Sequence, residues 1–220
     1  MAEEDALLRE VDEELRRERL EKLWKRYGNL FVALSVGLVV AVAGYKGWQY
    51  YQRQQAEQAG KAYVTALDLI RAGKQDAASA ALRKLAKGSH AGAAALAKLR
   101  LAALHAGKGE TEKAVALYRQ VEEDSSLELP LRNAARVRHA WLVVDSASRE
   151  ELAKILAGLD VAGNPWRAAA RELLALAALR AGDKKAARGY LKQLIDDAET
   201  PAQARSRVAV LFSLLGDEGK

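Results

Sequence analysis

Hydrophobic residues are concentrated in one long run near the N-terminus of the chain. From Tyr27 to Tyr45, nineteen consecutive residues carry no charged side chain, and nearly all of those from Leu30 to Ala43 are apolar. A helix rises about 1.5 Å per residue, so this run is roughly 28 Å long and matches a hydrocarbon core of about 30 Å. We therefore predict a transmembrane helix over residues 27–48.

The two borders of this run have the composition of membrane interfaces. Aromatic rings and basic side chains favour the boundary between lipid and water. They flank the run on both sides: Trp24, Arg26 and Tyr27 before the apolar core, and Tyr45, Lys46 and Trp48 after it. A cleaved signal peptide is the alternative, because Ala41, Val42 and Ala43 form a small-x-small pattern. The 26 residues before the run exceed the usual charged region of a signal peptide, which favours an anchor.

The basic residues around the span predict its orientation. Six Lys or Arg residues lie within residues 16–26, and only Lys46 and Arg53 lie just after the span. Because basic residues near a span stay in the cytoplasm, we expect residues 1–26 to be cytoplasmic and residues 49–220 to lie outside. The first segment is charged, with leucines at helical spacings. This pattern predicts either a helix lying partly on the inner leaflet or a docking site for a cytoplasmic partner.

One face of the predicted span is nearly smooth. Small residues recur there at intervals of four, four and three positions: Ala33, Gly37, Ala41 and Gly44. Such a face lets a second transmembrane helix approach closely. We therefore predict that these residues contact a partner helix, although glycine is also common in membrane helices generally.

After the span, the pattern predicts helices and no strands. Alanine and leucine dominate, apolar and polar residues do not alternate over any sustained stretch, and breaks fall at Gly, Pro and Ser. We expect an all-α domain with nine helices, near residues 50–72, 75–87, 90–106, 110–123, 130–144, 148–158, 165–181, 183–197 and 201–215. Three helix starts carry capping residues: Asn164 before Pro165, Thr200 before Pro201, and the Ser148–Glu151 capping box.

An internal repeat organises these helices into pairs. Ala-Gly followed by a polar residue recurs at Gly73, Gly107 and Gly182, and the first two glycines lie 34 residues apart, which is the tetratricopeptide period. An alanine follows five residues after a glycine in three units: Gly73 and Ala78, Gly109 and Ala114, and Gly182 and Ala187. A small residue suits the place where two helices cross closely.

This regularity predicts a tetratricopeptide-like α-solenoid of about four helix pairs plus a closing helix. The third unit is degenerate, because Asp145–Ser148 replaces its glycine turn and its second helix is short. An irregular helical bundle is the alternative, since alanine-rich helices produce Ala-Gly turns easily.

Charge and composition limit the classes of partner that this domain is expected to bind. The chain has a net charge of +6, and residues 46–220 carry 28 basic and 20 acidic side chains, which gives +8. A basic surface outside the cytoplasm attracts anionic lipid head groups or acidic clients, although a well-solvated surface also accounts for the charge. The absence of cysteine excludes disulfides and thiol chemistry. Nucleic acid is not an expected partner, because no aromatic-basic recognition motif occurs.

The sequence shows no pattern typical of an active site. His90, His105 and His139 lack a Cys, Asp or Glu at metal-ligand spacing. The acidic runs Glu122–Asp124 and Asp196–Asp197 end helices, and we expect them to be solvated. Neither a phosphate-binding loop nor a nucleophile motif occurs. We therefore predict no enzyme activity, no metal and no cofactor.

Two tryptophans stand out in the soluble domain, Trp141 and Trp166. Large aromatic rings in helical repeats belong to the core by default. Trp166 lies at a helix start, nearer a repeat edge, and is the better candidate for contact with a partner bound in a groove.

Residues on both sides of the span resemble those of one family. Trp24-Lys25-Arg26-Tyr27-Gly28 precedes the span, Gly44-Tyr45-Lys46-Gly47-Trp48-Gln49-Tyr50-Tyr51 follows it, and a degenerate tetratricopeptide domain completes the 220 residues. This combination resembles the ancillary SecYEG translocon subunit family. The resemblance implies a single-pass bacterial inner-membrane protein with a periplasmic C-terminal domain. It also implies association with the Sec translocon and periplasmic chaperones, and no catalytic residues.

Together these patterns predict a protein that acts by binding. We expect a membrane-anchored adaptor that recruits periplasmic chaperones to the translocon or holds newly exported proteins. The alternative is a scaffold of another envelope assembly, such as division, outer-membrane assembly or cytochrome maturation, because helical repeats serve many assemblies. An exported enzyme would require a convergent polar site, which the sequence does not display.

Overall fold

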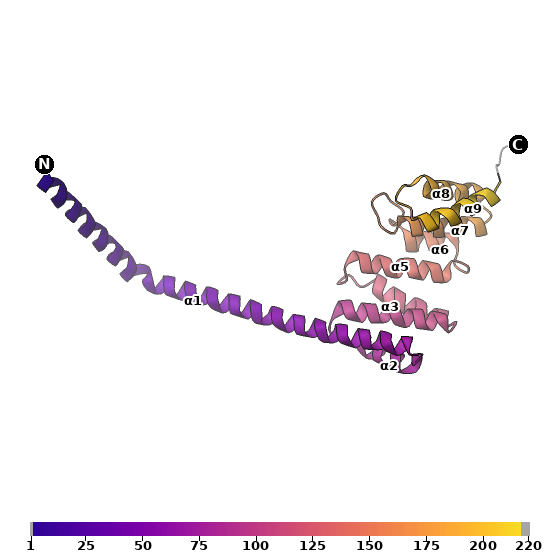
Figure 1. The fold of residues 1–220 in the computed structure, drawn as a ribbon, viewed down its shortest axis with the longest axis horizontal. Coiled ribbons are helices and arrows are strands. Elements are labelled where there is room, and N and C mark those ends of the chain that lie inside the picture. Colours follow the sequence, from indigo (N-terminus) through magenta and orange to yellow (C-terminus); the bar gives the residue numbers. More distant parts are fainter. Residues whose placement is uncertain (1, 217–220) are drawn as a thin grey trace. The chain divides into compact units, whose positions relative to one another are not determined.

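The computed structural model describes residues 2–216, and it includes the side chains of residues 16, 17, 20–22, 24–29 and 32–216. Every regular element in this part of the chain is a helix, which confirms the predicted all-α class. The helices are α1 (Ala2–Arg71), α2 (Gln75–Ala86), α3 (Ala91–Gly107), α4 (Thr111–Glu122), α5 (Leu129–Val143), α6 (Arg149–Leu156), α7 (Arg167–Arg180), α8 (Lys184–Asp196) and α9 (Ala202–Leu214) (Figure 1). The last eight begin and end within two residues of their predicted bounds.

The chain forms two compact units, residues 1–55 and 56–220. In the first unit the described chain is a single helix, the N-terminal part of α1. Within α1, Val32–Arg71 is long and apolar enough to cross a membrane, and it is the one such helix among the described residues. From Val32 to Val42 its aliphatic side chains are exposed, as at Leu34 (72%) and Val39 (67%). Such continuous apolar exposure is costly in water and ordinary in lipid.

The second unit stacks its helices in chain order. From α2 to α9 each helix packs on the next, and α3, α5 and α7 also contact one another in sequence (Figure 1). The first helices of the pairs are therefore the end of α1, α3, α5 and α7, and the second helices are α2, α4, α6 and α8. With α9 closing the stack, the prediction of four helix pairs plus one helix is confirmed.

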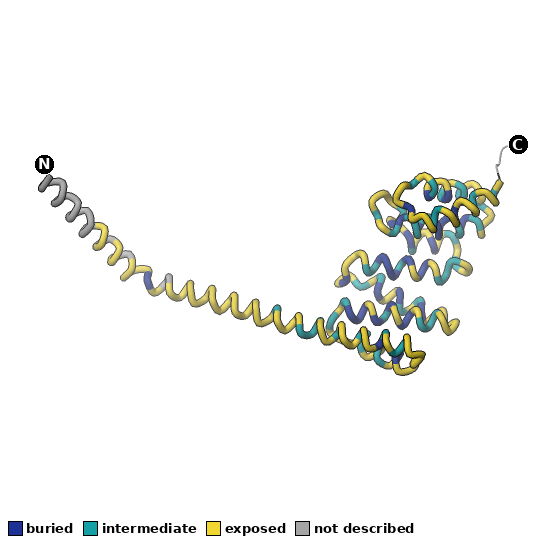
Figure 2. Tube along the Cα trace, viewed as in Figure 1, coloured by how far each residue is buried: buried dark blue, intermediate teal, exposed yellow. Residues whose placement is uncertain are grey.

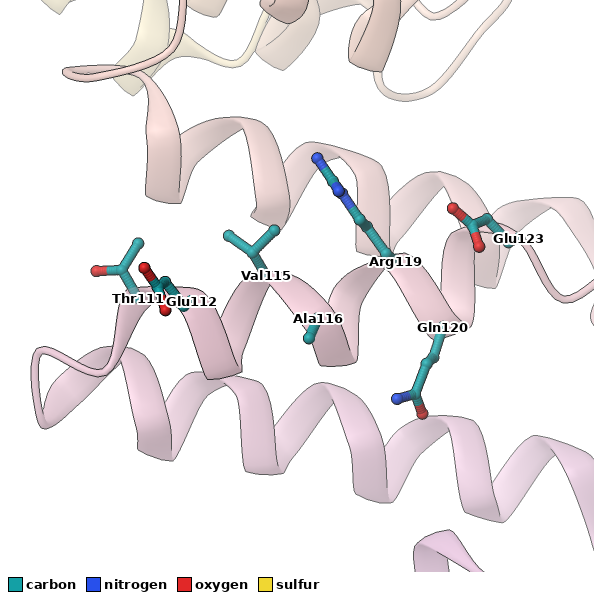
Figure 3. A pocket seen from close by; sticks show the side chains of 7 residues that line it. All are labelled: Thr111, Glu112, Val115, Ala116, Arg119, Gln120 and Glu123. Atoms are coloured by element: carbon teal, nitrogen blue, oxygen red, sulfur yellow. The ribbon is translucent and has the colours of Figure 1, made fainter.

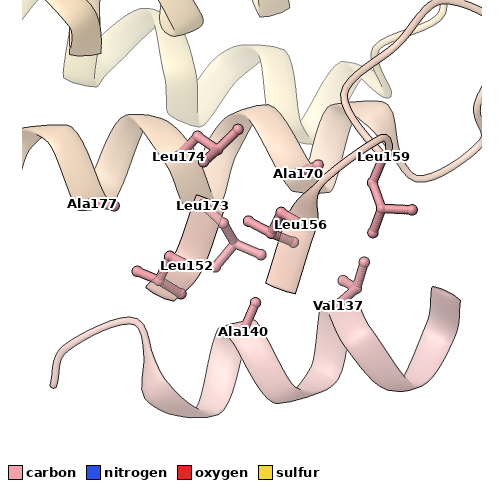
Figure 4. Packing of buried hydrophobic residues seen from close by; sticks show 9 residues of the cluster. All are labelled: Val137, Ala140, Leu152, Leu156, Leu159, Ala170, Leu173, Leu174 and Ala177. Carbon is pink, nitrogen blue, oxygen red and sulfur yellow. The ribbon is translucent and has the colours of Figure 1, made fainter. Parts of the chain in front are cut away.

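Buried residues recur along this stack (Figure 2). Among the described residues, apolar side chains form four buried clusters. Each cluster joins both helices of one pair to the first helix after them, or to α9 at the end. In the third cluster, Leu152 and Leu156 of α6 pack with Ala140 of α5 and Leu173 of α7 (Figure 4). A pair therefore completes its core only with its neighbour, as in other solenoids.

Glycine turns join the helices of three pairs. Gly73, Gly109 and Gly182 have φ angles of 74°, 76° and 76°, in the left-handed region that glycine adopts without steric cost. At each turn the glycine N–H donates to the carbonyl three residues earlier, and the next N–H donates to the carbonyl five residues earlier, at 2.9–3.0 Å. This pair of bonds is the Schellman motif, which satisfies carbonyls left open at a helix end.

The 34-residue spacing counted through Gly107 is wrong for the second pair, although its turn glycine is Gly109, as the spacing to Ala114 predicted. Gly107 is the last residue of α3, and the left-handed glycine is Gly109. Because α3 extends through Gly107, the equivalent turn glycines Gly73 and Gly109 lie 36 residues apart rather than 34.

The third pair keeps the packing register although it lacks the turn glycine. Ala78, Ala114 and Ala187 are fully buried, and each lies four residues after the N-cap of its helix. The N-cap of α6, Ser148, places Leu152 at that same position, and Leu152 is also fully buried. Counting four residues from the N-cap therefore finds the equivalent buried position in all four pairs. Counting from a turn glycine misses the third pair, which lacks that glycine.

Helix starts follow the capping predictions in part. The capping box is confirmed: the Glu151 N–H donates to Ser148 Oγ at 3.1 Å, and the Ser148 N–H donates to the Glu151 carboxylate at 2.8 Å. Asn164 Oδ1 accepts the Trp166 N–H at 2.9 Å, but the N-cap of α7 is Trp166, so the predicted cap lies two residues too early. The predicted cap at Thr200 is wrong, because its buried hydroxyl has no hydrogen-bond partner among the described residues.

Arginine side chains tie helix ends to other helices. Three guanidinium groups donate to backbone carbonyls at or beyond helix C-termini: Arg132 to Glu122, Arg136 to Ile155 and Ala157, and Arg180 to Val144, at 2.5–2.8 Å. Carbonyls at helix ends lack a partner within their own helix. These arginines supply the missing hydrogen-bond donor and thereby hold neighbouring helices together.

The turn geometry predicts the effect of replacing Gly182. No heavy atom lies within 4 Å of the place where a Cβ would stand, so the cost of a side chain comes from the positive φ alone. We expect Gly182→Val to lower the free energy of unfolding by about 1–2 kcal/mol, and Gly182→Asn to lower it less, because asparagine tolerates this conformation. Denaturant titration in detergent, followed by tryptophan fluorescence, measures both.

Gly189 provides the matched control, because it lies inside α8 and also has open space around its Cβ position. Gly189→Ala should raise the stability by up to about 1 kcal/mol, since helical glycine is unfavourable relative to alanine. Equal losses for Gly182→Val and Gly182→Asn would contradict the assigned turn.

Candidate protein-interaction surfaces

An open groove runs along the exposed side of α4. It has a volume of about 600 Å³ and is lined by Thr111, Glu112, Val115, Ala116, Arg119, Gln120 and Glu123 (Figure 3). Val115 and Arg119 stand on one side of α4 and Gln120 on the other (Figure 3). The groove therefore combines apolar, polar and charged groups.

A second groove shares Val115 and Arg119 with the first and continues over α5 and α6. It has a volume of about 340 Å³, and its other lining residues are His139, Val143, Ser146, Ala147, Glu151, Lys154 and Ile155. It includes the loop of the third pair, in which serine and alanine replace the glycine turn. A surface of this mixed character is typical of contacts between polypeptides.

A buried histidine and carboxylate lie beneath this second groove. His139 is 3% exposed, and its Nδ1 lies 3.0 Å from a Glu122 carboxylate oxygen. The expectation that Glu122 is solvated is wrong, because its side chain is only 14% exposed. The pair connects α4 to α5 and satisfies two polar groups that are costly to bury alone. Among the residues whose side chains are described, no group of three or more His, Asp or Glu is placed to hold a metal ion.

The two tryptophans of the domain occupy different environments. Trp166 is half-buried and packs against the cluster of α5, α6 and α7. Trp141 is 42% exposed on α5. The structure therefore favours Trp141 over Trp166 as an aromatic contact for a partner, the reverse of the order expected from the sequence.

The residues predicted to act in the membrane are all exposed. Ala33, Gly37, Ala41 and Gly44 are exposed along α1, and the Cβ positions of both glycines have open space around them. The aromatic residues beside the span are also exposed, with values of 64% for Trp24, 48% for Tyr27 and 61% for both Tyr45 and Trp48. Arg26 lies over the Tyr27 ring, 5.5 Å from its centre, and Lys46 is exposed.

The tryptophan before the span also makes a contact that the sequence did not predict. Gly28 is buried, and a Cβ there would lie 3.2 Å from the Trp24 ring. Glycine at this position therefore lets the indole lie against the helix. The four-residue spacing of Trp24 and Gly28 is the signal that could have revealed it.

An ion-pair network holds α7 to the loop between α8 and α9. Arg167 donates to both oxygens of the Asp197 carboxylate at 2.5 and 2.7 Å, and Arg171 donates to the same carboxylate at 3.0 Å. The side chains of all three residues are at most 14% exposed. The expectation that Asp197 is solvated is therefore wrong. Nearby, Arg207 of α9 pairs with Glu172 of α7 at 3.1 Å.

Comparison with known proteins gives two matches. Residues 21–201 match a family described as tetratricopeptide repeat-like domain. The chain is also 32% identical over 173 residues to the ancillary SecYEG translocon subunit of Escherichia coli (strain K12). These 173 residues cover 77% of this chain and 82% of that protein. No solved structure matches the chain. The family match includes the predicted span and the helices through α8.

The network around Asp197 predicts a pH-dependent contribution to stability. Hydrogen bonds from Arg167, and then from the Glu199 N–H, hold the pKa of Asp197 well below its ordinary value of 3.8. A carboxyl group whose pKa is lower in the folded state stabilises the fold above its ordinary pKa, and this stabilisation is lost as the pH falls toward the folded value. We expect Asp197→Asn to lower the Tm at neutral pH, with the difference from the wild type shrinking below about pH 4.

Asp196 is the matched control, since its side chain is 60% exposed and, in the part of the chain that the structure describes, pairs only with Lys192. Asp196→Asn should change the Tm little at either pH, because exposed pairs contribute little. If the difference in Tm between Asp197→Asn and the wild type stays constant or grows at acidic pH, the ion-pair network is not the cause.

Proposed function

Because the chain belongs to the tetratricopeptide repeat-like family and to that of the ancillary SecYEG translocon subunit, we propose that it is a membrane-anchored adaptor associated with the Sec translocon. The observation that carries this proposal is the 32% identity to a translocon subunit over most of both chains. The described structure agrees with it, because one candidate span precedes a domain of stacked helix pairs.

The two parts of the chain have separate tasks in this proposal. Residues 27–48 anchor the protein in the inner membrane, where the small face of the span, from Ala33 to Gly44, contacts a translocon helix. Residues 49–220 lie in the periplasm and bind chaperones or newly exported proteins through their helical surfaces. The mechanism is binding without catalysis.

The orientation of the span is the first test of this arrangement. Six basic residues precede the span within residues 16–26, so the N-terminus should be cytoplasmic. A phosphatase that is active only outside the cytoplasm should therefore work when fused after Lys220 and fail when fused before the span. Reversed activities would contradict the adaptor proposal. An intact mass showing that the mature chain starts after Ala43 would contradict the anchor.

Association with the translocon is the second test. SecYEG should be recovered with the full chain from mild detergent, and Gly37→Leu should reduce its yield roughly tenfold, as expected for the loss of about 1–2 kcal/mol of helix packing. Leucine remains compatible with lipid and fits within α1, because nothing lies within 4 Å of the Gly37 Cβ position. Val39→Leu, about half a helical turn away, is the control and should retain SecYEG.

Deletion of the domain after Gln58 separates the two partners. The shortened chain should keep SecYEG and lose periplasmic chaperones. Retention of SecYEG by Gly37→Leu, together with its loss on truncation, would place the translocon contact in the helical domain. Failure to recover SecYEG with the wild-type chain would reject the proposed function altogether.

A further inference from the structure

The first and second helices of the domain differ in charge. Together α3, α5, α7 and α9 contain ten Lys or Arg residues and one acidic residue, Glu172. The second helices α2, α4, α6 and α8 contain ten basic and six acidic residues. Because the number of basic residues is the same, the excess of positive charge on the layer formed by α3, α5, α7 and α9 comes from its shortage of acidic residues.

Most arginines of this layer are bonded within the fold. Backbone carbonyls or carboxylates accept hydrogen bonds from Arg132, Arg136, Arg167, Arg171, Arg180, Arg205 and Arg207. Arg100 of α3 and Arg138 of α5 differ from these, because both are exposed and neither has a hydrogen bond or ion pair within the described part of the chain. Their charge is available to a partner.

Arg100 and Arg138 occupy equivalent positions on adjacent helices. Each lies ten residues before the N-cap of the next helix, which is Glu110 in one pair and Ser148 in the other. Since α3 and α5 contact one another, the two arginines form a row of matching positions on neighbouring helices. Neither α3 nor α5 contains an acidic residue, so neither helix offers them a carboxylate.

Apolar side chains accompany this row on the same helix faces. Leu96 precedes Arg100 by four positions and is 40% exposed, and Trp141 follows Arg138 by three positions and is 42% exposed. Residues three or four positions apart share one face of a helix. Exposed leucine and tryptophan beside unbonded arginines are typical of a contact surface, in which aromatic residues and arginine are enriched.

We propose that this arginine face, formed by Leu96, Arg100, Arg138 and Trp141, binds an extended polypeptide segment that carries acidic and apolar side chains. The inference deepens the proposed function, on which it rests, by giving the chemistry of the chaperone or client segment. Carboxylates of the segment pair with the two guanidinium groups, and its apolar side chains cover Leu96 and the Trp141 ring.

The spacing of the row favours a polypeptide over anionic lipid. Packed helices lie about 10 Å apart, and an extended chain advances about 3.3 Å per residue. Arg100 and Arg138 therefore match carboxylates about three residues apart on one strand. The faces of helical solenoids also curve, so a flexible chain contacts them over more area than a flat bilayer does.

A peptide-binding measurement on the full chain tests this inference. The chain is placed in nanodiscs of phosphatidylcholine, and the probe is a fluorescent peptide of about twelve residues with glutamate at every third position and leucine or phenylalanine between. We expect Arg100→Glu combined with Arg138→Glu to weaken binding at least about tenfold. Trp141→Ala should also weaken it, and raised ionic strength should bring the wild type toward the charge-reversed variant.

The matched control reverses two exposed charges on second helices, Arg83→Glu in α2 with Lys185→Glu in α8. It makes the same change in net charge and should alter the affinity less than about twofold, within the range of distant surface charges. Equal weakening by both double variants would overturn the inference, because net charge alone would then attract the peptide. If thermal denaturation shows the first variant to be unfolded, Arg100→Gln with Arg138→Gln replaces it, and unchanged affinity there overturns the inference as well.

A second measurement, in nanodiscs that contain phosphatidylglycerol, tests whether the arginine face binds a polypeptide or anionic lipid. The affinity for the peptide should be the same as in phosphatidylcholine. If phosphatidylglycerol weakens peptide binding to the wild type and not to the charge-reversed variant, the arginine face binds lipid and the inference is wrong. Neither nanodisc holds a translocon, so the result is independent of the SecYEG recovery that tests the proposed function. The charge-reversed variant should still recover SecYEG at the wild-type yield.

Discussion

The helical domain depends on one close contact in each pair, between the first turn of the second helix and the helix that precedes it. Ala78, Ala114 and Ala187 are fully buried there, and Leu152 takes the same place in the third pair. Once this position is fixed against the preceding helix, the apolar side chains four and seven positions later pack into the cluster that also contains the first helix of the next pair, or α9 at the end. One local register thus generates all four clusters, and the last cluster is completed by Val208 of α9.

The same constraint determines which surfaces remain available to partners. The first helices are held between neighbours by apolar contacts and by arginines that bond to helix ends. Their remaining faces carry Arg100, Arg138 and Trp141, which the fold does not use. In the N-terminal unit, by contrast, the side chains from Val32 to Trp48 are all exposed. The helical domain therefore buries its own apolar side chains, whereas those of the candidate span remain exposed, as expected for a helix in lipid.

Local sequence patterns predicted the local features of this fold. They did not predict contacts between residues that are far apart in the sequence. Helix positions and the Ser148–Glu151 capping box depend on residues a few positions apart, so periodicity and capping rules predicted them. The environments of Glu122 and Asp197 depend on His139, 17 residues later, and on Arg167, 30 residues earlier. Both carboxylates ended a helix in a run of acids, which is the usual pattern of solvated residues, and no local signal distinguished them. The exposure of Trp141 likewise follows from which face of α5 packs on its neighbours, and the sequence alone did not determine that face.

In the proposed function, the span contacts the translocon while the helical domain binds other polypeptides. Photo-crosslinking in living cells tests it directly, with a photoreactive residue introduced at position 37 in one variant and at position 141 in another. The account predicts that position 37 crosslinks to a translocon subunit and position 141 to periplasmic chaperones or exported chains. Crosslinks from both positions to the same translocon subunit would contradict it, and so would crosslinks to periplasmic proteins from Ala116, in the α4 groove, with none from position 141.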